Sequence, residues 1–216
     1  MNKIFEKTHD PIWHLQVGVL AIIALQVFTG HFFLPAEKWL IVGVEVLLLL
    51  ALSFTTPAGY HKLSRPRRSL AVLLIGYVTL INFVSLGVLV AALLTNRFPV
   101  TGLDLLLNAA IIYATNIIIF ALWYWEMDGG GPDHRLQGSK KLDFMFPQQL
   151  HMRFVKDDWR PGFTDYVYLS ATNVTNFAAA DTIPVSHRAK MLMMVQSLAS
   201  VATVVLVAAR AISVMQ

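Results

Sequence analysis

The sequence contains no cysteine and few charged side chains. The absence of cysteine excludes disulfide bonds and thiolate metal sites. Charged residues make up 14% of the 216 residues, against about a quarter in an average soluble domain, whereas 56% of the residues are hydrophobic. The formal net charge of +4 is divided among several loops rather than gathered in one arm, so nucleic-acid binding is not expected. This composition predicts an integral membrane protein.

Long apolar runs predict an all-α, polytopic membrane protein with about five transmembrane helices. Roughly 20 apolar residues suffice to cross the hydrocarbon core of a bilayer. The segment before the first run has mixed charge, so that run is expected to be retained rather than removed as a signal peptide. The runs expected to cross are residues 12–33, 39–54, 70–94, 103–125 and 191–214.

Three polar side chains are expected at mid-span depth, namely Glu45, Asn82 and Asn116. An intramembrane carboxylate costs roughly 2.5–3.5 kcal/mol on insertion scales, so Glu45 needs a partner or a proton. The two asparagines are the candidate partners. Two interpretations of Glu45 stay open, a structural hydrogen bond and the handling of a proton or ion.

Two clusters suggest how the chain meets the membrane surface. Residues 55–69 carry Lys62, Arg65, Arg67 and Arg68 without an acidic residue, and short loops of this composition are usually cytoplasmic. The N-terminus is therefore expected inside. Trp123, Tyr124 and Trp125 are expected to form an aromatic belt at the lipid interface, and residues 142–159 a collar on the headgroups.

The stretch from Asp165 to Pro184 predicts a re-entrant half-helix followed by a turn. It begins with aromatic and apolar residues, becomes rich in Thr and Asn, and is too short and polar to cross a bilayer comfortably. Irregular backbone at membrane depth is tolerated only where protein or water satisfies its polar groups, so neighbouring helices or subunits are expected around it. A full crossing by residues 163–183, which would give six spans, stays open.

This region resembles the pore module of the potassium-channel superfamily. Thr172 and Thr175 end an aromatic segment, and a short turn then leads to Asp181, Pro184 and a long apolar run. The resemblance implies a pore helix, a filter-like turn and an inner helix. The filter-like residues that it implies are Thr172, Thr175, Asn176, Phe177, Ala178, Ala179, Ala180 and Asp181.

The resemblance also implies a division of the chain into two parts. Residues 1–100 would form a three-helix transmembrane domain, and residues 101–216 a potassium-channel-like pore module with an interfacial loop at residues 126–161. The whole chain is also similar to an uncharacterised family of bacterial integral membrane proteins that share Trp-Tyr-Trp-Glu, Gly-Gly-Pro, Asp-Phe-x-Phe-Pro-Gln and Thr-Asn-x-Thr elements. The expected location is the inner membrane of a bacterium.

The turn departs from a potassium filter. Such a filter needs glycines, because alternate residues take backbone angles that a β-carbon penalises. No glycine occurs between Asn176 and Asp181, so potassium selectivity is not expected. Asp181 would stand at the mouth of the turn or would cap the following helix.

The last apolar run carries a polar stripe. Gln196, Ser200, Thr203 and Arg210 recur at helical spacing. In a homo-oligomer this stripe would be an inner-helix lining of an aqueous path. Small residues on the same run fit close helix packing equally well.

We therefore expect an oligomeric, channel-like protein in the lipid bilayer, a homotetramer, with weak selectivity for monovalent cations. The alternative is a non-conducting membrane scaffold or a subunit of a larger membrane complex. No cofactor, metal site or enzymatic activity is expected, because no Ser-His-Asp, metal-ligand or Gly-rich phosphate constellation stands out. Gly129 to Gly131 lack the Lys and Ser/Thr of a phosphate loop, so a nucleotide site is not expected there. Sidedness stays open, since a potassium-channel arrangement would place residues 55–69 outside and charge counting places them inside.

Overall fold

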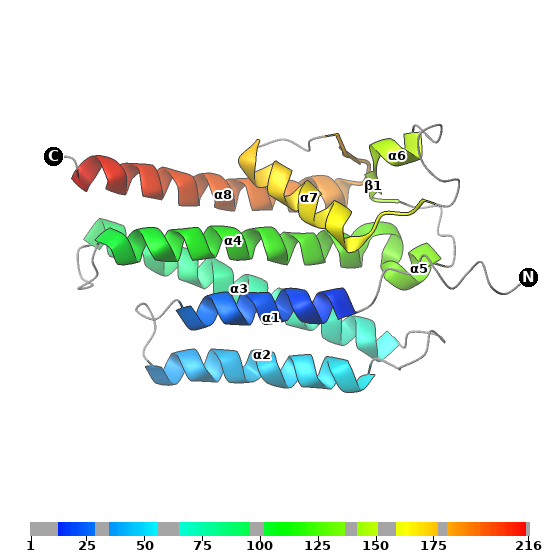
Figure 1. Ribbon diagram of the computed structural model, residues 1–216, viewed down its shortest axis with the longest axis horizontal. Helices are drawn as coiled ribbons and strands as arrows, with labels where there is room; N and C mark the ends of the chain where they lie inside the picture. The colour runs from blue at the N-terminus through cyan, green and yellow to red at the C-terminus, as the bar shows by residue number, and fades with distance from the viewer. Residues whose placement is uncertain are drawn as a thin grey trace, which may run out of the picture.

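The computed structural model describes seven stretches of the chain, and it is almost entirely helical, as predicted. Five long helices run side by side (Figure 1). The described residues are 13–28, 35–55, 65–95, 102–136, 142–150, 159–176 and 181–214. The long helices are α1 (Trp13–Phe28), α2 (Pro35–Thr55), α3 (Arg65–Thr95), α4 (Gly102–Met127) and α8 (His187–Val214).

Three of these helices are long and apolar enough to cross a membrane, namely α3, α4 and α8. Within the described residues, α1 and α2 are shorter apolar helices. Their outward surfaces are nevertheless apolar, since Leu47 and Phe54 of α2 are 67% and 88% exposed. Apolar surface on this scale is typical of contact with lipid or with another membrane subunit. The fold is therefore that of an integral membrane protein.

The shorter elements lie mainly at one end of the bundle. They are η1 (Asp128–Gly130), α5 (Pro132–Leu136), β1 (Phe144–Met145), α6 (Pro147–Leu150), α7 (Phe163–Thr175) and β2 (Ile183–Pro184). The two strands pair antiparallel, with Phe144 opposite Pro184 and Met145 opposite Ile183. Gly129, Gly130 and Gly131 all have positive φ, which lets the chain turn sharply where α4 ends.

Helix α4 is the centre of the bundle. It contacts α1, α3, α7 and α8, and it is apolar on most of its circumference, as a buried helix has to be. One buried cluster joins residues from α1, α2, α3, α4, α7 and α8. The predicted boundary near residue 100 therefore does not separate two hydrophobic cores.

Two predictions about aromatic residues are wrong. Tyr124 and Trp125 are fully buried rather than placed in an interfacial belt. Phe144 and Phe146, expected in a collar on the headgroups, are buried in the same core. The reason is that the chain after α4 folds back onto the end of the bundle, where Tyr124 and Phe144 meet edge to face at 5.0 Å.

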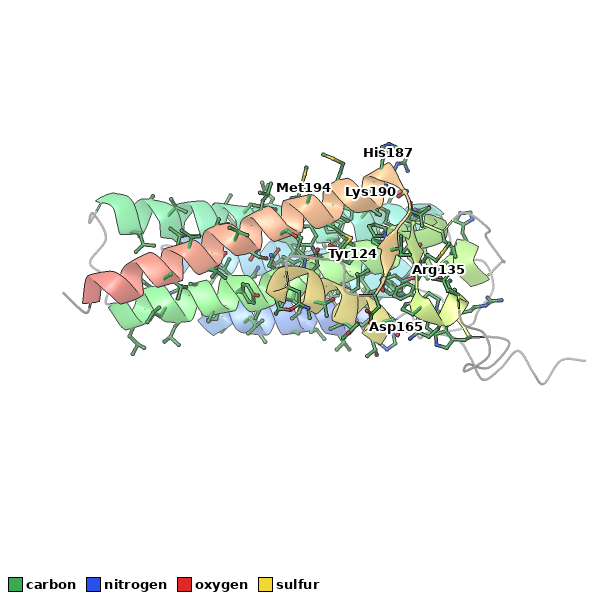
Figure 2. The ribbon with its side chains drawn as sticks, turned by 90° about the horizontal axis from the view of Figure 1, so that it is seen from above. Tyr124, Arg135, Asp165, His187, Lys190 and Met194 are labelled. Atoms are coloured by element: carbon green, nitrogen blue, oxygen red, sulfur yellow. The ribbon has the colours of Figure 1, made fainter. Side chains whose placement is uncertain are left out.

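The charges are distributed unequally between the two ends. All Lys and Arg residues whose side chains the structure describes lie at the end where α4 finishes and α3 and α8 begin, which we call the cationic end. Figure 2 shows Arg135, Asp165, His187 and Lys190 together at this end. The cations are Arg67, Arg68, Arg135, Arg160, Arg188 and Lys190.

Candidate functional site

Helix α7 enters the bundle from the cationic end, and the chain returns to the same end. At its start, the Phe163 ring stacks on His14 in the first turn of α1 at 5.3 Å. On the return, β2 pairs with β1, and the Val185 backbone N–H donates to the Asp143 carbonyl at 2.8 Å. We call residues 163–184 the re-entrant segment. Its residues 177–180, which include Phe177, Ala178, Ala179 and Ala180, lie outside the described residues.

The tip of α7 reaches the middle of the bundle. The helix has 13 residues, about 20 Å at the usual rise of 1.5 Å per residue, and the hydrocarbon core is about 30 Å thick. Near the middle of α4, the Tyr113 hydroxyl donates to the Val174 carbonyl at 3.2 Å. The tip therefore stops about halfway along α4 (Figure 1).

Local hydrogen bonds define both ends of α7. The Gly162 backbone N–H donates to Asp165 Oδ2 at 2.7 Å, and a carboxylate in the first turn is also favoured by the helix dipole. At the other end, the Thr172 and Thr175 hydroxyls donate to carbonyls of the preceding turn at 2.9 Å each. These bonds satisfy the two hydroxyl donors within the helix.

A buried polar network fixes α7 between α4 and α8. The Asn173 side-chain amide donates to Gln196 Oε1 at 2.8 Å and to the Met193 carbonyl at 3.1 Å. The Tyr124 hydroxyl donates to the same Gln196 oxygen at 2.5 Å. Gln196 Nε2 in turn donates to Ser170 Oγ at 2.6 Å. One glutamine on α8 thus joins all three helices.

The network continues along α4. Ser170 Oγ donates to the Ile117 carbonyl at 2.7 Å, and Asn116 Nδ2 donates to Ser200 Oγ at 2.8 Å. A buried polar group that lost its partner here would cost about 1–3 kcal/mol, so the network favours one depth and one rotation of α7. We define the polar network as Asn116, Tyr124, Ser170, Asn173, Gln196 and Ser200.

The polar stripe of α8 faces the interior of the subunit. Gln196 and Ser200 are fully buried in the polar network, and Thr203, 2% exposed, donates to the Ala199 carbonyl of its own helix. These three side chains are therefore not on a surface that neighbouring subunits would share. Arg210 lies on α8, and its side chain is outside the described residues. The outward side of α8 is apolar, with Met191, Met194, Leu198, Val201 and Val205 exposed.

The tip of α7 is polar and open. Thr175 and Asn176 are exposed and Thr172 is partly exposed. The Asn176 backbone N–H closes the helix on the Thr172 carbonyl at 2.9 Å. The C-terminal end of a helix carries a partial negative charge. The tip can therefore present oxygen atoms and negative potential to a cation at mid-depth.

Asp181 lies on the return path of the chain. It is exposed, and it precedes β2 by two residues, or at most about 7 Å of extended chain. The alternative in which Asp181 caps α8 is wrong, because Ser186 Oγ accepts the Ala189 backbone N–H at 3.1 Å and supplies that cap. The carboxylate is thus left exposed near β2, at the cationic end.

Asp128 is an anchor that the sequence did not reveal. Its Oδ1 accepts the backbone N–H groups of Asp143 and Phe144, at 2.7 and 3.1 Å, and its Oδ2 accepts the Tyr166 hydroxyl at 2.6 Å. Arg135 Nη1 donates to the Asp128 carbonyl at 2.7 Å. Asp128 therefore ties β1, and through it β2, to the start of α7. An acid in a glycine-rich turn is ordinarily a solvated charge, so its burial has no local sequence signal.

The three predicted intramembrane polar residues are buried but do not form one site. Glu45 is 0% exposed, Asn82 is 6% exposed and Asn116 is 2% exposed. Asn116 belongs to the polar network, where its amide bonds to Ser200. Among the described residues, Gln26 rather than an asparagine is the side chain that interacts with Glu45, and no well-oriented hydrogen bond reaches either Glu45 oxygen, so the predicted pairing of Glu45 with an asparagine is wrong. The described residues contain no group of three His, Cys, Asp or Glu side chains that could hold a metal ion.

Comparisons with protein-family models, with curated proteins and with solved structures give no match for this chain.

Proposed function

We propose that the protein is an oligomeric, channel-like membrane protein whose α7 tips surround a central axis. In this proposal α1, α2, α3, α4 and α8 cross the membrane and the re-entrant segment does not. A homotetramer is the proposed assembly, and monovalent cations are the proposed permeant species, with weak selectivity. The observation that carries the proposal is the open, polar tip of α7 halfway along an apolar bundle.

The cost of exposing this tip to lipid supports an assembly. Thr175 and Asn176 are exposed beside the apolar outer side of α8. A polar backbone group left unsatisfied in hydrocarbon costs several kcal/mol, so non-helical backbone occurs at this depth only against protein or water. Neighbouring subunits around an axis would provide both.

Electrostatics favour cations over anions in such a path. The C-terminus of α7 would direct its partial negative charge at the axis. Asp181, repeated in each subunit, would form an acidic ring at the entrance. Because no glycine occurs between Asn176 and Asp181, a potassium-selective ladder of carbonyl oxygens is not proposed.

The cationic end supports a cytoplasmic entrance. Lys and Arg are enriched in loops on the cytoplasmic side of membrane proteins, and the re-entrant segment begins and ends on that side of the bundle. The entrance would then be inverted relative to a potassium channel, with the N-terminus inside and the end of α8 outside. The inner membrane of a bacterium is the proposed location.

Reconstitution tests this proposal. The purified protein is expected to be a symmetric oligomer by native mass spectrometry and to pass monovalent cations in liposomes. The variant Thr175→Val with Asn176→Leu should lose the flux, because an apolar tip does not hold a hydrated ion. Thr164→Val is the matched control, since Thr164 is an exposed threonine near the start of the same helix. Only monomers in mild detergent, or flux at the protein-free background, would contradict the proposal.

A non-conducting scaffold is the second candidate. It is favoured by the burial of Gln196, Ser200 and Thr203 inside the subunit and by the apolar outer side of α8. In that case the tips of α7 would fasten subunits together without leaving a path. An oligomer that survives purification and reconstitution but carries no ions would support the scaffold over the channel.

A further inference from the structure

Glu45 occupies a core position of α2. The helix lies at the edge of the bundle (Figure 1) and contacts α1 and α3. Val42, Glu45, Leu49 and Leu52 recur at spacings of three and four residues and are all buried, so they form the inner face of the helix. Glu45 is 0% exposed. A carboxyl group thus takes a place that the pattern otherwise gives to aliphatic side chains.

No positive charge faces this carboxyl group within the described residues. Among the described side chains, Gln26 of α1 lies close enough to Glu45 to interact through hydrogen bonding, and Tyr77 of α3 senses its charge without a hydrogen bond to it. The other titratable side chains described on these three helices, His14, Arg67 and Arg68, lie at the cationic end. No well-oriented hydrogen bond from a described residue reaches either Glu45 oxygen, so the interaction with Gln26 is a weak one. An ionised carboxylate in this position would have little compensation for the water it has lost.

A proton satisfies the site better than a metal ion does. Hard metal cations such as Ca²⁺ and Mg²⁺ take about six or more oxygen ligands, and among the described side chains the Glu45 carboxylate has only the Gln26 amide as a hydrogen-bonding neighbour. A proton needs a single oxygen and cancels the charge. A neutral carboxyl can also donate a hydrogen bond to the Gln26 side chain after a small rotation.

We propose that Glu45 is a proton-binding site enclosed by α1, α2 and α3, and that it keeps its proton at a pH at which an ordinary glutamate is ionised, while α2 is packed on its neighbours. Release of the proton then requires α2 to separate from α1 and α3. The site links the packing of α2 to pH independently of whether the assembly conducts ions.

A hydrophobic carbodiimide tests the proposal on the full-length protein in detergent. The protonated carboxyl adds across one C=N bond: its oxygen joins the central carbon, its proton moves to nitrogen, and the O-acylisourea rearranges to a stable N-acylurea. Nothing leaves, so the labelled peptide gains the mass of one reagent molecule. We expect this adduct on Glu45 at about pH 7, where an ordinary glutamate is ionised and unreactive, and progressively less adduct as the pH rises.

Two controls make the result specific. A water-soluble carbodiimide with an added amine should label the exposed Asp181 and spare Glu45. The variant Glu45→Gln, which keeps the shape of the neutral group, should lose the adduct, and peptide mapping of the wild-type protein identifies the labelled residue even if the variant does not fold.

Thermal unfolding supplies a second readout. Above about pH 5 the packed protein would hold a proton that the unfolded chain has already released, so raising the pH from about 5 to about 8 should lower the unfolding temperature of the wild-type protein. In the Glu45→Gln variant the unfolding temperature should fall less over the same pH range, because the contribution of Glu45 is absent. Absence of the Glu45 adduct at about pH 7, in protein whose Asp181 is labelled, would overturn the proposal. Protection of Glu45 by added Na⁺ at constant pH would also overturn it, because the site would then hold a metal cation.

Discussion

The Asn173 amide of α7 donates a 2.8 Å hydrogen bond to Gln196 Oε1 of α8. The bond is buried, since Asn173 and Gln196 are 2% and 0% exposed. Because Gln196 also bonds to Ser170 and Tyr124, it connects the short helix to both of its neighbours. The position of the α7 tip therefore depends on a side chain that is itself fully buried.

We expect Gln196→Leu to destabilise the protein by about 2–3 kcal/mol. The change removes the oxygen that accepts hydrogen bonds from Asn173 and Tyr124 and the N–H group that donates to Ser170. The polar atoms of these three residues would stay buried without that partner. Thermal unfolding in detergent measures the effect. Thr203→Val is the control, since the described contact of that hydroxyl is to its own helix, and its effect should be much smaller. Equal stability of the two variants would show that the network does not hold α7.

Asp128→Asn is expected to loosen the cationic end. The backbone N–H groups of Asp143 and Phe144 and the Tyr166 hydroxyl now donate to the two carboxylate oxygens. In the variant an amide NH₂ group would replace one of these oxygens and face one or more of the donors, which should lower the free energy of unfolding by about 1.5–3 kcal/mol. Tyr166→Phe removes one of the same bonds and should cost about 1 kcal/mol. The rate of limited proteolysis between residues 137 and 160 measures this loosening. We expect the Asp128→Asn variant to be cleaved faster than the Tyr166→Phe variant. The reverse order would contradict the role of Asp128 as the anchor.

Asp181→Asn should lower the preference for cations over anions by a few-fold while the oligomer stays intact. In the proposed assembly, a ring of neutral side chains would no longer concentrate cations at the entrance. Reversal potentials under a salt gradient measure the preference. Asp104→Asn, at the opposite end of α4, is the matched control and should change it little. An unchanged reversal potential in Asp181→Asn would place the carboxylate away from the ion path.

Phe177→Ala should raise cation flux in liposomes. Phe177 lies outside the described residues, but in the sequence it is the only bulky side chain among Asn176 and three alanines. A ring of phenyl groups at an axis is a hydrophobic constriction that closes by losing water. Leu198→Ala on the outer side of α8 is the control. Background flux from an intact Phe177→Ala oligomer would support the scaffold.

Single cysteines can establish sidedness, because the chain has no cysteine of its own. Leu103→Cys lies at the exposed start of α4, and Lys190→Cys lies at the exposed start of α8. In intact cells a membrane-impermeant maleimide should label the first and not the second. Permeabilised cells should show both. The opposite pattern would place the cationic end outside.

The sequence predicted the helical class well because apolar runs carry their signal locally. The bounds of α7, Phe163–Thr175, also fall close to the segment expected to be a half-helix, since Thr and Asn are poor choices for a lipid-facing span. The prediction of an aromatic belt failed because aromatic residues such as Tyr124 and Trp125 occur both at a lipid interface and in a protein core, and the local sequence does not distinguish the two. Only the position of the chain after α4 decides between the two.

Long-range contacts account for the rest of the site. The burial of Asp128 depends on Tyr166, and the orientation of Gln196 depends on Asn173 and Tyr124. Periodicity located the polar stripe on α8 correctly but gave no information on which neighbour it faces. The structure directs it at α4 and α7.

The hydrogen bond between Gln196 and Asn173 also affects when the parts of the chain can assemble during translation. Residues that hold α7 by its polar face lie on α8, which the ribosome makes later, and the partner strand of β1 is likewise made only at residues 183–184. During translation α7 emerges before its acceptors exist. A nascent chain stopped before Gln196 would therefore carry an α7 that can contact α4 but lacks its partners on α8, and the re-entrant segment would be among the last parts of the molecule to reach its place.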